Sequence, residues 1–202
     1  MTPVLISPPA CEPVSLVEAK EWLRLDQSGE DDLVMALITS ARGIIEAATR
    51  RMLITQTWRL VFDRWPGRRA YHDGYRLRPE IVILPLAPFQ SIAAIRVIDA
   101  GGVAESLAAS SYSVVSAPEQ ARVVFNAAPP MPGAPGGGIQ LDTIVGYGDE
   151  PASVPEPLRL AIKMLTAHWF ENRGDIETAT SVDRLPGPIG ALIAPFRRAR
   201  LT

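Results

Sequence analysis

The sequence contains little cysteine or histidine, the side chains that most often bind zinc. Its 202 residues include one cysteine, Cys11, and two histidines. A single cysteine excludes an intrachain disulfide and a zinc site made of several thiolates. No long apolar run occurs, so no membrane-spanning helix is predicted, and the first residues lack the basic segment of a signal peptide. We therefore expect an intracellular protein that does not enter a membrane.

An excess of positive charge is absent as well. The formal net charge is −2 at pH 7 and the sequence pI is about 5.7. Proteins that depend on phosphate contacts are usually basic, so dedicated nucleic-acid binding is disfavoured. Proline, in contrast, is abundant, with 19 residues. This is about twice the average share, and it indicates many fixed loops and extended segments.

Three segments have apolar residues at helical intervals, at about residues 15–25, 31–51 and 157–173. Ser15 lies three residues before Glu18, which is the spacing of a capping box. This pair predicts that the first helix begins at Ser15.

The pattern changes over residues 54–147 to short alternating or β-branched runs, separated by turns rich in proline and glycine. The whole chain is therefore predicted to have an α+β fold with three parts. Residues 1–53 and 154–174 form a small helical bundle, residues 54–150 form an inserted antiparallel β module, and residues 175–202 form an extended C-terminal tail.

Each histidine has an acidic neighbour. His168 and Glu171 are spaced to share one side of a helix, but a metal site in a bundle needs ligands from other helices, and the first two helices contain no histidine. His72 and Asp73 are adjacent, and neighbours on an extended chain point in opposite directions. We predict no enzyme, no metal and no cofactor. A small metal-dependent enzyme is the alternative that analysis of His168→Ala would test.

The C-terminal tail mixes apolar and basic side chains. It is too short to form its own core, so its apolar residues indicate docking on a partner protein, and cutting the chain after about Gly190 is expected to abolish docking while leaving the fold intact. The interleaved arginines suit a protein surface better than nucleic acid alone. The predicted docking residues are Leu192, Ile193, Pro195, Phe196, Arg197, Arg198, Arg200 and Leu201.

Four segments occur together in a recognisable order. They are "VSLVEAKEWLRLD", "EDDLVMALITSARGIIEAATRRMLITQTWRL", "LPLAPFQSIAAIRVIDAGG" and "VPEPLRLAIKMLTAHWFENRG". In this order and spacing the chain resembles the head–tail connectors, also called adaptors, of long-tailed bacteriophages and gene transfer agents. The resemblance covers roughly residues 14–174, and the ending "LIAPFRRARL" is also similar, whereas the proline loop at 126–138 is less typical.

The resemblance implies a structural role at the head–tail junction of a virion or phage-like particle that assembles in the bacterial cytoplasm. Members of this family form a closed twelvefold ring beneath the portal. The implied partners are the portal protein, neighbouring copies in the ring and a tail-side stopper or terminator protein. DNA would pass through the ring without sequence-specific binding, which suits an acidic protein. No membrane is implied.

In such a ring the helices are expected to pack side by side. The residues predicted to lie in the bundle core or between subunits are Trp22, Leu33, Leu37, Ile45, Leu165 and Trp169. The other reading within the same particle is an accessory protein that touches DNA through its arginines, and a steep salt dependence of DNA binding would favour it.

Overall fold

The computed structural model describes residues 1–66, 81–117, 120–133, 136–172 and 185–197. The chain divides into two compact units. The helical unit contains Pro9–Thr55 and the described residues from Gly146 on. The β unit contains Met1–Pro8 and the described part of Gln56–Val145.

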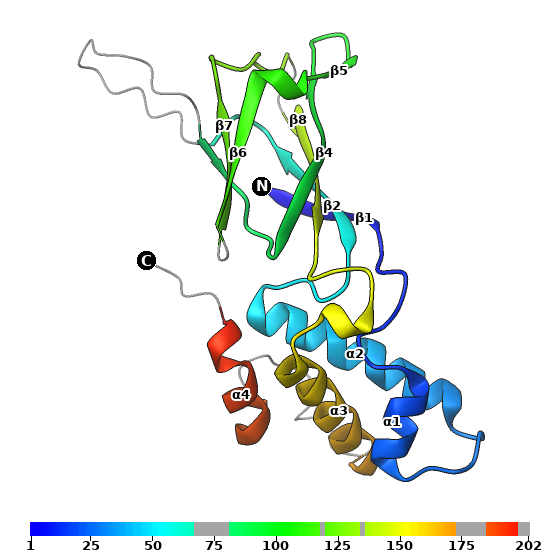
Figure 1. The fold of residues 1–202 in the computed structure, drawn as a ribbon. Helices are drawn as coiled ribbons and strands as arrows, with labels where there is room; N and C mark the ends of the chain where they lie inside the picture. The colour runs from blue at the N-terminus through cyan, green and yellow to red at the C-terminus, as the bar shows by residue number, and fades with distance from the viewer. Residues whose placement is uncertain (67–80, 118–119, 134–135, 173–184, 198–202) are drawn as a thin grey trace. The chain divides into compact units, whose positions relative to one another are not determined.

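Four α-helices make up the helical unit within the described residues: α1 (Leu16–Leu23), α2 (Asp31–Thr49), α3 (Glu156–Glu171) and α4 (Gly187–Ile193) (Figure 1). The first three were predicted from periodicity, and their observed ends lie within two residues of the predicted ones. The capping box at the start of α1 is also confirmed, because Ser15 and Glu18 cap each other's backbone N–H groups. The predicted α+β class is confirmed.

The core of the helical unit lies between α2 and α3. α2 contributes Val34, Ile38, Ala41 and Ile45, which recur every three or four residues and are at most 2% exposed. α3 contributes a matching set, and burial of each large side chain stabilises the fold by about 1.5–3 kcal/mol. The buried residues of α3 in this core are Leu158, Ala161, Ile162 and Leu165.

α4 lies in the segment that was expected to be an extended tail, and the structure corrects that expectation. Ile189 and Ile193 of α4 are 2% and 0% exposed and belong to the core of the helical unit. A 3₁₀ turn, Ala194–Phe196, follows the helix. The Phe196 carbonyl accepts a hydrogen bond of 2.8 Å from Nε of Arg51. The chain up to Phe196 is thus part of the folded unit.

The β unit holds a five-stranded antiparallel sheet in the order β1-β2-β8-β4-β5. Its strands are β1 (Thr2–Ser7), β2 (Gln56–Phe62), β8 (Ile139–Val145), β4 (Phe89–Ile98) and β5 (Ala104–Ser106). The pairing of β2 with β8 runs without a break from Gln56 opposite Val145 to Phe62 opposite Ile139. The antiparallel β module expected from the alternating pattern is therefore present.

A second sheet of three strands has the order β3-β7-β6. These strands are β3 (Ile81–Ile83), β7 (Gln120–Phe125) and β6 (Tyr112–Ala117). Side chains of both sheets share one core, in which the Trp65 ring meets the Phe125 ring edge-on at 4.9 Å. The Trp65 indole N–H donates to the Pro130 carbonyl at 2.8 Å, so its polar atom is satisfied while the ring is buried.

β1 changes the expected domain boundary at the N-terminus. Residues 1–53 were assigned to the helical bundle, but Met1–Pro8 belong to the β unit because β1 pairs with β2 along the edge of the larger sheet. Every residue of β1 is exposed, and Val4, Leu5 and Ile6 are each more than 40% exposed. An edge strand without a buried face lacks the alternation that marks a strand in a sequence.

Candidate interaction surfaces

The candidate catalytic groups do not gather into a site in the described part of the chain. No cluster of three histidine, cysteine or acidic side chains suited to a metal occurs there. His168 lies with Nδ1 3.4 Å from Nδ2 of Asn172, and the neighbouring Glu171 is exposed. His72 and Asp73 lie outside the described residues. No helix among the described residues is long and apolar enough to cross a bilayer.

Cys11 is in a poor position to react as a nucleophile. Its thiol donates to the Asp149 carbonyl at 3.3 Å. Burial raises the pKa of the Cys11 thiol above its ordinary value, and the charges of Glu150 and Glu12 raise it further. Because the thiolate is the reactive form, this thiol stays protonated at neutral pH.

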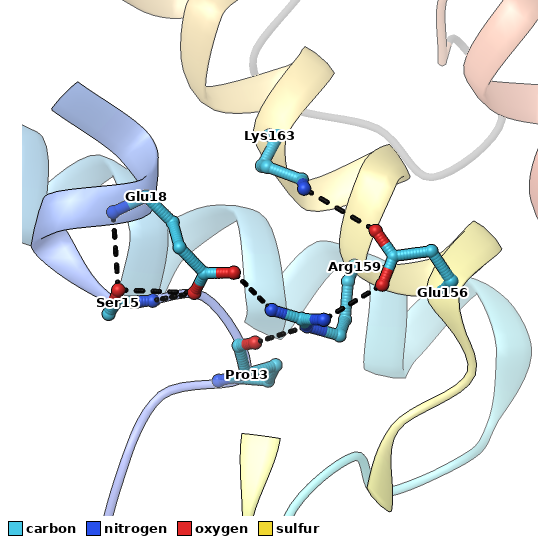
Figure 2. A network of polar contacts seen from close by, with 6 residues as sticks. All are labelled: Pro13, Ser15, Glu18, Glu156, Arg159 and Lys163. Carbon is cyan, nitrogen blue, oxygen red and sulfur yellow. Dashed lines mark hydrogen bonds and ion pairs between the residues drawn. The ribbon is translucent and has the colours of Figure 1, made fainter. Parts of the chain in front are cut away.

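Arg159 of α3 is the centre of a polar network that joins α1 to α3 (Figure 2). Its Nη1 pairs with Glu156 at 2.8 Å and its Nη2 pairs with Glu18. Its Nε donates to the Pro13 carbonyl at 3.0 Å. Glu18 also accepts from the Ser15 backbone N–H at 3.0 Å, so one carboxylate caps α1 and holds the guanidinium. One arginine therefore fixes the start of α1 against α3.

A second arginine, Arg42 of α2, holds the segment before α1. It donates to Glu12 at 2.7 Å and to Glu46 at 3.1 Å. Glu46 is buried and also accepts the Leu53 backbone N–H at 2.8 Å, so it joins α2 to the chain that follows it. Thr39 donates to the other oxygen of Glu12 at 3.0 Å. Together, Arg42 and Arg159 fix the chain from Glu12 to the start of α1.

Glu18→Gln is expected to lower the free energy of unfolding at pH 7 by about 1 kcal/mol, because glutamine can still form the capping box but loses the ion pair with Arg159 and the negative charge at the start of α1. Partial burial acts to raise the pKa of Glu18, but the hydrogen bonds from Ser15 and the charge of Arg159 outweigh it, and the net shift is downward. A lowered pKa means that this stabilisation is present above the ordinary value and is lost as the pH falls through the folded value.

Urea unfolding of wild type and Glu18→Gln at pH 7 and at pH 3 measures this effect. The difference between the two proteins should be smaller at pH 3 than at pH 7. Glu21→Gln is the matched control, because Glu21 lies on the same helix and is exposed. An equal loss in Glu21→Gln, or a difference that does not depend on pH, would contradict the role assigned to the network.

The β unit carries its own charged cluster on the outer face of the larger sheet. Asp142 of β8 lies between Arg59 of β2 and Arg96 of β4. Arg59 binds both carboxylate oxygens, at 2.7 and 2.9 Å, and Arg96 binds one at 2.6 Å. The hydrogen bond from Arg59 lowers the pKa of Asp142, burial opposes that shift, and Arg96 adds to it. Three adjacent strands are thus cross-linked by one carboxylate.

The residues predicted for the bundle core or for subunit contacts fall into different environments. Ile45 and Leu165 are buried in the core of the helical unit. Leu37 and Trp169 are partly buried. Trp22 and Leu33 are 48% and 37% exposed. The last two are therefore surface residues.

The residues predicted for portal docking are also placed differently from one another. Ile193 is fully buried, while Leu192 and Phe196 are partly buried against the same core. Pro195 and Arg197 are exposed. The remaining predicted residues, Arg198, Arg200 and Leu201, lie outside the described residues. Arg51, which holds Phe196, was not predicted, because the two residues are 145 positions apart in the sequence.

Exposed apolar side chains occur on both α1 and α2. In the described helical unit the large ones are Val17 and Trp22 of α1, and Leu33 and Met35 of α2. The Trp22 ring lies under the Lys163 ammonium group, at 5.8 Å from Nζ to the ring centroid. An open groove of about 650 Å³ runs beside α1. Its lining residues are Leu16, Val17, Lys20, Glu21, Arg24, Leu25, Asp26 and Asp31.

Comparison with known proteins finds matches among solved structures. No protein-family model and no curated protein matches the sequence. Solved structures of gene transfer agent particles do contain a similar chain. One is a chain of the neck of an empty particle, computed with C6 symmetry, with 25% identity and a TM-score of 0.78. Another belongs to the virion of a native particle, with 26% identity and a TM-score of 0.79.

A third match is a chain of the neck of a native particle, computed with C12 symmetry, with 25% identity and a TM-score of 0.76. Each of these matches covers 100% of the present chain and 98% of the other chain. The similarity therefore includes both units. The predicted resemblance to a gene transfer agent component is confirmed at this level.

Proposed function

We propose that this protein is a structural component of the neck of a gene transfer agent or related phage-like particle, where it joins the DNA-filled head to the tail. The observation that supports this most strongly is the similarity of the whole chain to two chains of particle necks, at TM-scores of 0.76 and 0.78 and 25% identity. A likeness confined to one common domain would say little about function. A likeness that includes both units favours the same structural role.

In this proposal twelve copies form a closed ring beneath the portal. The DNA passes through the ring without sequence-specific binding, and a stopper or terminator protein binds on the tail side. A cyclic ring uses two different faces of each subunit, because each copy meets its two neighbours through different surfaces. The net charge of −2 favours a channel that does not hold phosphates tightly.

We further propose that the portal is contacted by the C-terminal segment, from Pro195 onward. The buried Ile193 and the hydrogen bond from Arg51 to the Phe196 carbonyl hold the beginning of this segment on the helical unit. Pro195 and Arg197 are exposed and available to a partner. The other predicted docking residues follow directly, and their arginines suit acidic side chains or carbonyl groups of a portal surface.

A chain that stops after Arg197 tests this function. It lacks Arg198, Arg200 and Leu201 but keeps α4 and Phe196, so it should fold with an unchanged melting temperature. In a producing strain it should yield DNA-filled heads without tails, as deletion of the whole gene should. Electron microscopy of the particles and a gene-transfer assay measure the two effects.

The matched control is Thr202→Ala, which changes the end of the chain without removing a predicted docking residue. Normal tailed particles from the shortened chain would overturn the docking proposal. Normal tailed particles after deletion of the gene would overturn the neck function itself.

A further inference from the structure

The outward face of α2 carries no charge over about four turns. Its exposed residues after Asp32 are Leu33, Met35, Ala36, Thr39, Ser40, Gly43 and Ala47. We call this set the α2 face. A surface helix usually places charged residues on the side away from its core. In α2 the remaining charged side chains, Arg42 and Glu46, are directed into the cluster with Glu12.

Gly43 lies in the middle of this face and has no structural reason within the described chain. A Cβ atom added there would meet no atom within 4 Å. Glycine destabilises a helix interior relative to alanine, so the chain carries a cost here without an internal contact that requires it. A glycine on an exposed helix face does allow another chain to approach closely. The α2 face thus leaves open space at Gly43, where a neighbouring chain could approach closely.

The exposed side chains of α1 provide a contrasting surface on the same unit. Val17 is 66% exposed, and Trp22 is 48% exposed and does not belong to the core cluster. Exposed tryptophans are typical of the residues that dominate protein–protein contacts. Two charges close to them are paired. Lys20 binds Asp31 at 2.7 Å. Lys163, which lies over the Trp22 ring, binds Glu156 at 3.4 Å. We call Val17, Glu21 and Trp22 the α1 surface.

We propose that, in the ring, the α2 face of one copy packs against the α1 surface of the next copy, with Gly43 at the closest approach. This inference rests on the proposed neck function. The occupant is a second copy because a ring needs two unlike faces, and this unit offers an uncharged face of mostly small residues and a second surface with an exposed valine and tryptophan. DNA or an acidic protein would leave an uncharged face without electrostatic partners.

Cross-linking inside assembled particles tests the contact. Glu21→Cys and Ser40→Cys are introduced together in a Cys11→Ser background, so that the new cysteines are the only ones and Gly43 is kept; Ser40 lies on the α2 face about one turn before Gly43. Both positions are exposed. A short bismaleimide should join position 21 of one copy to position 40 of the next, and denaturing gels should show a ladder of covalent oligomers that extends beyond the dimer. Each single variant should give no cross-linked product.

The outcomes separate this inference from the function on which it rests. Absence of the protein from purified particles, seen by immunoblotting, would overturn the neck function. Protein that is present in particles but gives no ladder in the double variant would overturn the α1–α2 contact. A dimer formed by Ser40→Cys alone would also overturn it, because two α2 faces would then meet each other.

Two further variants check the contact without cysteines. Ala47→Glu should fold normally but reduce incorporation into particles at least tenfold, because a charge would be buried against the neighbour. Ala152→Glu is the matched control, since Ala152 is an exposed alanine of the same unit outside both surfaces. Gly43→Ala should raise the melting temperature of the free chain by about 2–4 °C. Normal incorporation of Ala47→Glu would contradict the proposal.

Discussion

Cutting the chain after Gly190 is expected to unfold the helical unit. The cut removes Ile193, which is fully buried, and Leu192 and Phe196, which pack against the same core. Loss of one buried isoleucine side chain lowers the free energy of unfolding by about 2–5 kcal/mol. The hydrogen bond from Arg51 to the Phe196 carbonyl is lost as well. The total is comparable to the 5–15 kcal/mol that typically separates folded from unfolded domains. The sequence alone predicted that this cut leaves the fold intact, whereas the structure predicts that the shortened chain loses its fold.

Circular dichroism and urea unfolding of the two shortened chains measure the effect. The chain that ends at Arg197 retains α4 and is the control, and it should unfold at the same urea concentration as the full chain. Ile193→Ala in the full-length protein should lower the free energy of unfolding by about 2–5 kcal/mol. This variant measures the contribution of one buried side chain, apart from the effect of removing the whole segment. A stable, cooperatively folded chain ending at Gly190 would show that α4 contributes little.

Asp142→Ala is expected to destabilise the β unit by about 2–3 kcal/mol. The carboxylate is 8% exposed and neutralises two guanidinium groups, so its removal leaves Arg59 and Arg96 facing each other across the outer face of the sheet. Removal of one partner from a fully buried ion pair costs about 3–5 kcal/mol. The smaller figure applies here because the two arginine side chains are 28% and 31% exposed.

The pH dependence of the same variant gives an independent check. Because the pKa of Asp142 is lowered in the folded protein, its stabilisation is full above the ordinary value of 3.8 and is lost as the pH falls through the folded value. The stability difference between wild type and Asp142→Ala should therefore shrink in acid. Glu105→Ala is the control for loss of an exposed carboxylate in the same unit. An undiminished difference in acid would argue that packing, not charge, explains the effect.

Periodicity was sufficient to predict the elements that bury one face. α1, α2 and α3 show an apolar stripe, and the strands with one buried face, such as β2 and β7, alternate or are β-branched. β1 and α4 escaped prediction for physical reasons. Neither face of β1 is buried, and the strand forms because its backbone pairs with the edge of β2. α4, with the sequence GPIGALI, contains two glycines and a proline, and it is held by burial of its isoleucines rather than by helix propensity.

The surfaces were less predictable than the fold. The capping partner Glu18 is visible in the sequence because it is local, but its contact with Arg159 joins residues 141 positions apart. Trp22 has the spacing of a core residue on α1, and only the structure shows that it faces solvent. The resemblance of four sequence segments to head–tail connectors predicted the type of particle, because matched order carries information that composition does not.

β1 has a consequence for how the protein is made. The strand ends at Ser7 and its partner β2 begins at Gln56, so 49 residues must be added before pairing can start. At a synthesis rate of about 5–20 residues per second, the edge strand waits roughly 2–10 seconds without a partner. During that time the nascent chain carries a short unpaired apolar segment made of Val4, Leu5 and Ile6. This segment is available to chaperones or to other newly made chains. Once β2 is made, the edge pair of β1 and β2 can form before the centre of the larger sheet, because β8, which lies between β2 and β4, is synthesised last of the five strands.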